Sequence, residues 1–291
     1  MQTLTQYCLK LFGEKIYKIS LDAGFTCPNR DGTLGDRGCI FCSAGGSGDF
    51  AGDRRLPLAD QIAQGKALVA GKYRGSRYLA YFQAFTNTYA ETARLEALFR
   101  PVLEREDICG LSVATRPDCL DAEKLALLSR LNRQKPVWVE LGLQTVKEDS
   151  VRYIRRGYPT AVYDAAVSAL TAEGIHVVTH VILGLPGESP EDMEESVRHA
   201  VAAGSGGIKL QLLHVLRGTD LAEDYLAGKF TLPTREEYLA LLDRCLAQLG
   251  KDTVIHRVTG DGPRALLLAP LWSTDKKQLL NQIRPIMEKY L

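Results

Sequence analysis

The sequence lacks most features that would place the chain in a membrane, outside the cell or on a repetitive scaffold. No apolar run approaches the roughly 18 residues that a membrane-spanning helix needs. The start, MQTLTQYCLKLFGEK, has neither a basic first region nor a continuous apolar stretch, so we expect no signal peptide. There is no low-complexity tract, short repeat or obvious linker. The net charge is only +1, so any nucleic-acid partner must bind through local basic patches.

Cysteine occurs seven times, which leaves one thiol over from any fully paired disulfide framework. An odd number without a secretion signal is typical of the reducing cytoplasm, where thiols stay free for metal binding or chemistry. We therefore expect a cytoplasmic protein without a membrane partner. The 291 residues, 45% of them apolar and 24% charged, suffice for one large α/β domain or two small ones.

Apolar runs rich in β-formers alternate with segments of helical periodicity. The runs are nearly continuous in apolar character, as strands covered on both faces are, and they lie at 15–21, 77–85, 109–115, 137–144, 176–185 and 207–216. Six strand–helix units predict a parallel sheet with right-handed crossovers. A TIM barrel needs eight units, so six indicate an α/β fold that is a partial barrel or a doubly wound sheet. In either, the chemistry belongs at the carboxyl ends of the strands.

Helix starts are marked by hydroxyl residues with a carboxylate three positions later, as in a capping box. We expect such starts at Thr88, Thr145 and Thr234, and an N-cap at Ser189 followed by a proline at the first helical position. The expected organisation is a core over residues 1–228 and an α/β extension over 229–291 packed on it.

Residues 25–42, FTCPNRDGTLGDRGCIFC, carry three cysteines in a glycine-rich loop after the first strand. Structural zinc normally takes four protein ligands, and the histidine nearest to the loop is His176. A lone CxxC is also typical of structural zinc or a redox pair. The third cysteine and the loop position favour a 4Fe–4S cluster on Cys27, Cys39 and Cys42, which leaves one iron free of protein. Glycines at 32, 35 and 38 allow the backbone to wrap closely, and Phe41 offers an aromatic face to a cofactor ring.

The loop resembles that of radical S-adenosylmethionine (SAM) proteins, and more narrowly of the YhcC/YtqA family, whose pattern is CPNRDGT…GCxFC instead of CxxxCxxC. Further segments resemble that family in order: YFQAFTNTYAE, ATRPDCL, VELGLQT, ILGLPGE, GIKL, HRVTGDGPR and LAPLW. The resemblance implies a partial (β/α)6 radical SAM barrel. It also implies a 4Fe–4S cluster and SAM as cofactors, which together generate a 5′-deoxyadenosyl radical that abstracts hydrogen from an unactivated carbon.

The resemblance and the strand ends together suggest which residues hold SAM. Gln83 and Asn87 follow the second strand, where the fold usually receives the amino group of SAM. Glu140 and Gln144 lie on the fourth strand and can both point into the barrel, with Gln144 a candidate for the ribose. Arg156 follows, and its guanidinium is suited to the SAM carboxylate. Each of these polar residues has an alternative interpretation as a helix cap or a water bridge.

The fifth turn, ILGLPGE, suggests that the backbone at Gly184, Pro186 and Gly187 approaches the adenine. Cys119, just past TRPD on the expected reactive face, is the candidate catalytic residue, as a hydrogen donor or thiol partner. The remaining cysteines are interpreted as small buried hydrophobes: Cys8, Cys109 and Cys245.

Two positions depart from the family pattern. Tyr158 replaces a histidine, which puts a proton-transfer role there in doubt. Gln211 and Leu212 replace a common His-Pro pair.

The resemblance extends to elongator-type enzymes and to the YtqA branch (MnmL-type), which the segments HRVTGDGPR and LAPLW favour. It implies a tRNA substrate whose wobble-uridine side chain changes from carboxymethylaminomethyl to aminomethyl. A flavodoxin- or ferredoxin-type protein is the expected electron donor. Basic clusters suited to phosphates lie near residues 72–77, 152–156 and 256–264, although each is also typical of a solvated face. The alternatives are a radical SAM enzyme acting on a small metabolite and a non-catalytic iron–sulfur or electron-transfer protein.

Overall fold

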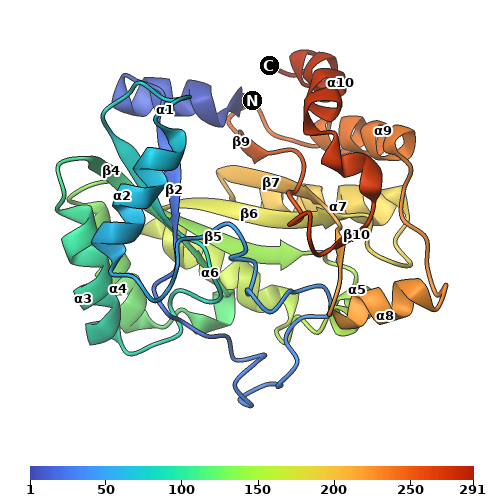
Figure 1. Ribbon diagram of the computed structural model, residues 1–291, viewed down its shortest axis with the longest axis horizontal. Coiled ribbons are helices and arrows are strands. Elements are labelled where there is room, and N and C mark those ends of the chain that lie inside the picture. The colour runs from blue at the N-terminus through green and yellow to red at the C-terminus, as the bar shows by residue number, and fades with distance from the viewer.

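One parallel sheet organises the molecule, and it curls into an open partial barrel in this computed structural model, which describes residues 1–291 (Figure 1). The strands lie in the spatial order β2–β3–β4–β5–β6–β7–β9–β1. Their bounds are β1 (Gln2–Thr3), β2 (Tyr17–Leu21), β3 (Tyr78–Phe82), β4 (Ile108–Thr115), β5 (Val137–Gln144), β6 (His176–Leu183), β7 (Gly207–Leu212) and β9 (Val254–Arg257). A short antiparallel pair, β8 (Val215–Leu216) and β10 (Leu267–Ala269), stands apart from it.

The six strands expected from the sequence are β2 to β7, and they lie side by side in chain order. Every neighbouring pair is parallel. A doubly wound sheet requires a reversal of strand order at a switch point, and no reversal occurs between β2 and β7. The α/β partial barrel is therefore confirmed.

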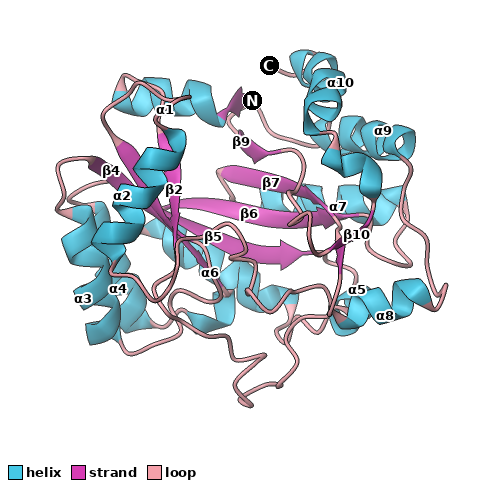
Figure 2. Cartoon of the chain, in the orientation of Figure 1, coloured by secondary structure: helices cyan, strands magenta, loops and turns pink.

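Helices alternate with the strands and cover the sheet (Figure 2). The α-helices are α1 (Leu4–Phe12), α2 (Leu58–Val69), α3 (Thr92–Leu103), α4 (Ala122–Asn132), α5 (Glu148–Tyr153), α6 (Thr160–Ala172), α7 (Pro190–Ala202), α8 (Asp220–Leu226), α9 (Arg235–Leu246) and α10 (Lys276–Glu288). Two 3-10 turns, η1 (Pro117–Cys119) and η2 (Leu271–Thr274), complete the chain. None of the helices combines the length and the apolar character needed to cross a bilayer.

The two ends of the chain extend the six-stranded core of the sheet. β9 pairs with β7, and β1 pairs with β9 on its far side. The sequence indicated a strand near β9 but not β1, because two residues are too short to show a period. The segment after residue 228 thus contributes a strand to the common sheet, while the proposed boundary at 228/229 stays a prediction.

Two of the four expected helix starts are confirmed. Ser189 and Thr234 each close a capping box, with Asp192 and Glu237 as the third-position partners. The expectation was wrong for Thr88 and Thr145, because α3 is capped from Glu91 and α5 from Lys147. Both threonines instead use their hydroxyls inside the protein, Thr88 on the Cys119 carbonyl and Thr145 on Glu188.

The main apolar core contains 45 buried residues between the sheet and its helices. A smaller cluster of nine buried residues lies under the cysteine loop. Ile40, which lies between two of the loop cysteines, belongs to this second cluster together with Ile154 and Leu221. Its amide donates to the Ile154 carbonyl and its carbonyl accepts from the Leu221 amide, so the loop is fixed by burial and by backbone hydrogen bonds.

Candidate active site

The cysteine loop leaves the end of β2 and is held over the sheet by side chains from within the loop. Asn29 donates from Nδ2 to the Arg155 carbonyl at 2.7 Å and to Sγ of Cys39 at 3.4 Å. Arg30 donates to the carbonyls of Cys42 and Ser43 at 2.8 and 2.6 Å. These contacts shape the loop.

Glycine is required at position 38 of this loop. Its φ is +77°, a conformation that L side chains rarely adopt. A Cβ there would also lie 2.8 Å from Nε of Arg30. The residue therefore permits the Arg30 side chain to cross the loop and reach the two carbonyls beyond Cys39.

The three cysteines of the loop line one cavity as free thiols. Burial raises the pKa of Cys39 to about 12, and the neighbouring Cys42 and Cys27 thiols add to this shift. A hydrogen bond from Asn29 acts in the opposite direction and lowers the pKa. Such a site favours a cationic centre that would stabilise the thiolates. No group of three His, Cys, Asp or Glu side chains is arranged to hold a single metal ion. A cluster spreads its cysteine ligands over separate iron atoms, so the donor set fits a 4Fe–4S cluster.

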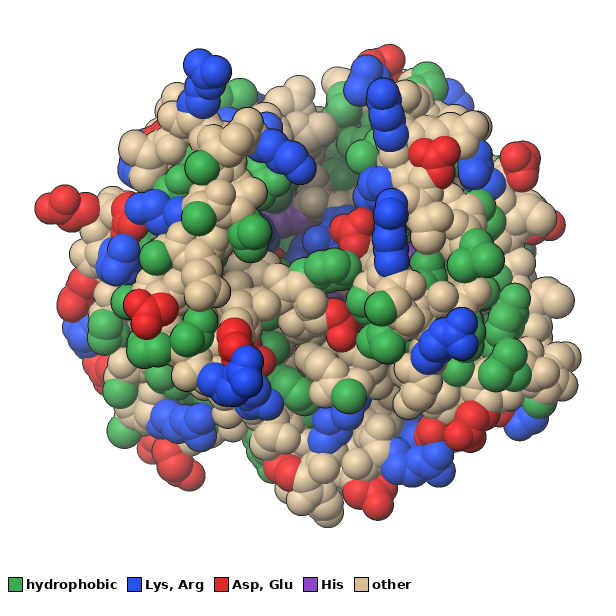
Figure 3. All heavy atoms as spheres, in the orientation of Figure 1, with side chains coloured by type: hydrophobic (Ala, Val, Ile, Leu, Met, Phe, Trp, Pro, Cys, Tyr) green, Lys and Arg blue, Asp and Glu red, His purple; other side chains and the backbone are tan.

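The cavity has a volume of about 950 Å³ and extends from the cysteines to the C-terminal segment. Figure 3 shows it as a hollow with Lys, Arg and His side chains at its bottom. Eight Lys or Arg residues line it against three Asp or Glu residues. A cavity with this excess of positive charge favours anionic ligands.

Gln144, expected to bind SAM, ends β5 in a strained conformation with φ of +59°. Its side chain lines the cavity, and its Oε1 atom is buried without a hydrogen-bond partner. Its Nε2 atom lies 2.2 Å from where a Cβ on Gly142 would be. An orphaned acceptor on a strained residue in a cavity is typical of a ligand site, and a hydroxyl such as that of a ribose would satisfy it.

Arg156, expected at the SAM carboxylate, is 1% exposed and donates mainly to backbone. Nη1 donates to the carbonyls of Leu143 and Thr145 at 2.7 and 2.8 Å, and Nε donates to the Tyr158 carbonyl at 3.0 Å. Burial lowers the pKa of Arg156. These contacts shape the turn after β5, so they favour a positioning role, and a direct contact with SAM stays a prediction.

Tyr158, the departure from the family pattern, lies between two arginines. Its ring centre is 4.9 Å from the Arg116 guanidinium and 4.8 Å from that of Arg156. Its hydroxyl donates to the Gly142 carbonyl at 2.7 Å. Burial raises its pKa far above the ordinary value, so Tyr158 is a neutral structural donor rather than a proton-transfer group at neutral pH.

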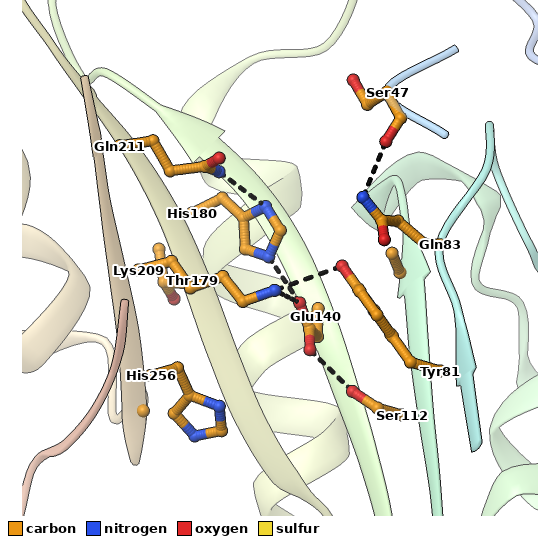
Figure 4. Close-up of polar contacts among 12 residues, drawn as sticks. Ser47, Tyr81, Gln83, Ser112, Glu140, Thr179, His180, Lys209, Gln211 and His256 are labelled. Atoms are coloured by element: carbon orange, nitrogen blue, oxygen red, sulfur yellow. Dashed lines mark hydrogen bonds and ion pairs between the residues drawn. The ribbon is translucent and has the colours of Figure 1, made fainter. Parts of the chain in front are cut away.

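Glu140 is 1% exposed and forms the centre of a polar network inside the barrel (Figure 4). Lys18 and the Ser112 hydroxyl each donate to Oε1 at 2.6 Å, and His180 lies 2.7 Å from Oε2. Lys209 pairs with the same Oε2 atom. Burial alone would raise the pKa of Glu140, but the two ammonium groups outweigh it and hold that pKa well below its ordinary value. Both carboxylate oxygens of Glu140 are thus bound by other side chains of the protein, and its expected contact with the cofactor stays a prediction.

The other expected cofactor residues divide into two groups. Phe41 and Gln83 line the cavity, and Gln83 donates to the Ser47 carbonyl at 2.8 Å. Asn87 does not line it: the residue is fully buried, and its Nδ2 donates to the carbonyls of Phe82, Ala84 and Ala114. Asn87 therefore ties β3 to β4.

The fifth turn and the candidate catalytic cysteine also lie outside the cavity wall. The structure does not bring Gly184, Pro186 or Gly187 to the cavity, although Ile182, just before them, lines it. Cys119 is buried, and burial raises the pKa of its thiol to about 12. The proposed adenine contact and hydrogen-donor role thus have no support from the geometry and stay predictions.

Sequence reasoning missed several residues of the cavity floor, chiefly Tyr81, His180 and Lys209, and it noted Arg257 only as part of a basic cluster suited to phosphates. A signal for them existed, because His180 and Lys209 interrupt strands that are otherwise nearly apolar. Charged residues within buried strands are rare unless paired or functional. Lys18, opposite Glu140 in the network, shows the same pattern.

Comparisons with known proteins agree with this geometry. The Radical SAM superfamily profile matches residues 32–200, and the Radical_SAM C-terminal domain profile matches residues 206–289. "Uncharacterized protein YtqA" of Bacillus subtilis is 42% identical, over 98% of this chain and 89% of that protein. "Protein YhcC" of Escherichia coli is 37% identical, over 91% of this chain and 85% of that protein.

More distant relatives share part of the chain. "tRNA uridine(34) acetyltransferase" of Dehalococcoides mccartyi is 30% identical over 62% of this chain and 38% of that protein. The archaeal Methanocaldococcus infernus Elp3 structure superimposes with a TM-score of 0.65 at 19% identity, over 79% of this chain and 57% of that one. Methylornithine synthase (PylB) superimposes with a TM-score of 0.55 at 13% identity, over 96% and 84%. Both likenesses concern the fold.

The superfamily uses a 4Fe–4S cluster and SAM, and these are the cofactors for which Cys27, Cys39, Cys42 and the cavity are suited. When bound, they supply abstraction of a hydrogen atom from a substrate carbon. The two profiles together cover β3 to β7 of the barrel and most of the chain after it. The chain belongs to the radical SAM superfamily of enzymes and, within it, to the YhcC/YtqA family.

Proposed function

We propose that this enzyme modifies the wobble uridine of tRNA, shortening a carboxymethylaminomethyl side chain to aminomethyl. The observation that carries the proposal is the charge of the cavity, in which eight Lys or Arg residues face three Asp or Glu residues. A cavity next to the cysteines that attracts anions suits a polyanionic substrate with a base turned out of its stack. The partial similarity to a tRNA uridine(34) acetyltransferase supports the same substrate class.

The proposed reaction balances with the cofactors of the family. The carboxymethyl carbon gives up a hydrogen atom, the neighbouring amine gives up a proton, and one further electron leaves, so that a C=N bond forms. Water cleaves this imine into the primary amine and glyoxylate. SAM is the net two-electron oxidant, because it takes up both electrons and one proton and yields 5′-deoxyadenosine and methionine, and the electron that starts each turnover is recovered. A flavodoxin- or ferredoxin-type donor would supply the priming electron in the cytoplasm.

The residues of the chain have distinct tasks in this proposal. Cys27, Cys39 and Cys42 would hold the cluster, and Gln144 would accept a hydrogen bond from the ribose of SAM. Lys72 and Arg264, which line the outer part of the cavity and are exposed, would meet RNA phosphates. Such contacts give modest affinity that falls with salt, consistent with the net charge of +1.

An anaerobic assay with reconstituted enzyme tests the proposal. tRNA carrying the carboxymethylaminomethyl group is incubated with SAM and a reductant, and its nucleosides are measured by mass spectrometry. We expect the aminomethyl nucleoside, glyoxylate and 5′-deoxyadenosine in equal amounts. An unchanged nucleoside profile, both here and in a strain that lacks the gene, would contradict the proposal. An enzyme for a small metabolite would ignore tRNA, and a non-catalytic protein would form no 5′-deoxyadenosine.

A further inference from the structure

A row of nitrogen-bearing side chains crosses the floor of the cavity. His180 on β6 is in register with Lys209 on β7, and Lys209 is in register with Arg257 on β9. Partners in neighbouring parallel strands project to the same face of a sheet, and all three residues line the cavity. Figure 4 shows Lys209 and His180 directed toward Glu140 from adjacent strands.

The positive charge on this floor exceeds the negative charge. The carboxylate on this floor is that of Glu140, and it forms ion pairs with both Lys18 and Lys209. Burial lowers the pKa of His180 to about 4, so that ring is neutral at pH 7 and adds no charge. Arg257 adds a further cation. Lys18 and Lys209 share Glu140, and burial lowers the pKa of Lys209 to about 7, so Arg257 is the cation without a carboxylate partner.

Arg257 is the side chain that this imbalance leaves free. Its guanidinium lines the cavity without a hydrogen bond or ion pair to any other residue. The other two cavity carboxylates are engaged elsewhere, Asp261 with Lys276 and Asp49 with the Ser43 hydroxyl. Unpaired charge in a partly enclosed site carries a desolvation cost that an anionic ligand would offset.

We propose that this floor binds a carboxylate carried by the substrate, with Arg257 and Lys209 as its donors. The inference rests on the proposed function and deepens it, because a carboxymethylaminomethyl group ends in a carboxylate. A guanidinium fork next to an ammonium group suits a carboxylate. A thin side chain ending in a carboxylate can reach the interior of the barrel, whereas a phosphodiester is fixed to the bulky RNA backbone.

Binding of the carboxylate at the floor would also explain which carbon of the substrate loses a hydrogen atom. The methylene that loses hydrogen in the proposed reaction is bonded directly to the carboxylate carbon. Holding the carboxylate on Arg257 and Lys209 therefore fixes the reacting carbon to within one bond. The aminomethyl side chain of the product tRNA lacks the carboxylate, so it no longer binds the floor and the tRNA is released.

The test compares an acid with its neutral analogue. Reconstituted enzyme with SAM receives 5-carboxymethylaminomethyluridine or its methyl ester, and both turnover and binding by equilibrium dialysis are measured. For Arg257→Ala we expect the KM or Kd of the acid to rise roughly tenfold or more, and the preference for acid over ester to disappear. Arg257→Lys should restore part of the preference. Arg217→Ala removes an exposed arginine outside the cavity and should leave the preference intact.

The outcomes separate this inference from the proposed function. If the wild type converts the tRNA and Arg257→Ala converts it equally well with the same acid preference, the floor does not bind the carboxylate. If the wild type shortens no side chain but binds the acid in preference to the ester through Arg257, the proposed function is wrong and the proposed carboxylate site is supported. A higher SAM requirement in Arg257→Ala, with the acid preference unchanged, would assign Arg257 to the carboxylate of SAM and overturn the inference. Iron content and thermal unfolding of each variant exclude misfolding.

Discussion

Nδ2 of Asn29 lies 2.7 Å from the carbonyl oxygen of Arg155 and donates to it, joining the cysteine loop to the turn after α5. The same nitrogen lies 3.4 Å from Sγ of Cys39. One side chain thus fixes the position of a cluster ligand relative to the segment that follows α5 and carries Arg156. The Ile40 amide, which donates to the Ile154 carbonyl, joins the same two segments.

Replacing Asn29 with alanine should weaken this coupling. We expect Asn29→Ala to bind iron but to lose it several times faster than the wild type under a chelator, because Cys39 loses a donor that favours its thiolate. Iron release is followed by absorbance after addition of the chelator. Asn281→Ala, an exposed change on α10, is the matched control. Equal release rates for the two variants would contradict the role of Asn29.

Arg156 can either hold the turn after β5 in place or bind the SAM carboxylate directly, and the two roles predict different results. Because its buried guanidinium donates to three carbonyls, Arg156→Lys should lower the free energy of unfolding by about 2–4 kcal/mol. Denaturant unfolding measures this loss. A variant of normal stability whose KM for SAM is greatly raised would instead assign Arg156 to the SAM carboxylate.

The pKa of Lys209 predicts how stability varies with pH. Burial lowers this pKa from 10.5 to about 7, with Lys18 and Arg257 adding to the shift and Glu140 opposing it. Between those two pH values the unfolded chain binds more protons than the folded one, so the free energy of unfolding rises with pH in that window. Lys209→Met removes the titrating group and should flatten this part of the profile. Denaturant unfolding at pH 7 and 9 tests it, and equal slopes for both proteins would contradict the assignment.

The exposed Lys72 and Arg264 predict the salt dependence of tRNA binding. Each phosphate contact contributes about one unit to the slope of log affinity against log salt. Replacing both residues with alanine should therefore reduce the slope by roughly two, measured by filter binding across salt concentrations. Lys10→Ala, an exposed lysine of α1, controls for the loss of charge. A slope that does not change in the double variant would place the RNA elsewhere.

The sequence predicted the sheet well because its information is local. Each of the strands β2 to β7 lies in a nearly continuous apolar run, and the three cysteines lie within sixteen residues of chain. The capping residues were harder to predict. Thr145 has the spacing of a capping box, yet its hydroxyl bonds Glu188 on a distant segment, and tertiary contacts of this kind leave no local pattern.

The cavity was predicted only in part for the same reason. Strand-end position identified Gln144 and Gln83, but it also selected Asn87, whose amide is used by three backbone carbonyls. Lys209 and Arg257 meet through the pairing of β7 with β9, strands more than forty residues apart in the chain. No spacing rule predicts such a pair without the sheet order.

The iron content of cysteine variants tests the central claim, a 4Fe–4S cluster held by three cysteines of one loop. Cys27→Ala, Cys39→Ala and Cys42→Ala are each reconstituted anaerobically beside the wild type, with Cys245→Ala as a control that removes a buried thiol from α9. We predict about four irons per chain in the wild type and the control, and cluster loss in each of the three variants. Full iron content in any of those three, or zinc in place of iron in the wild type isolated without oxygen, would contradict the account.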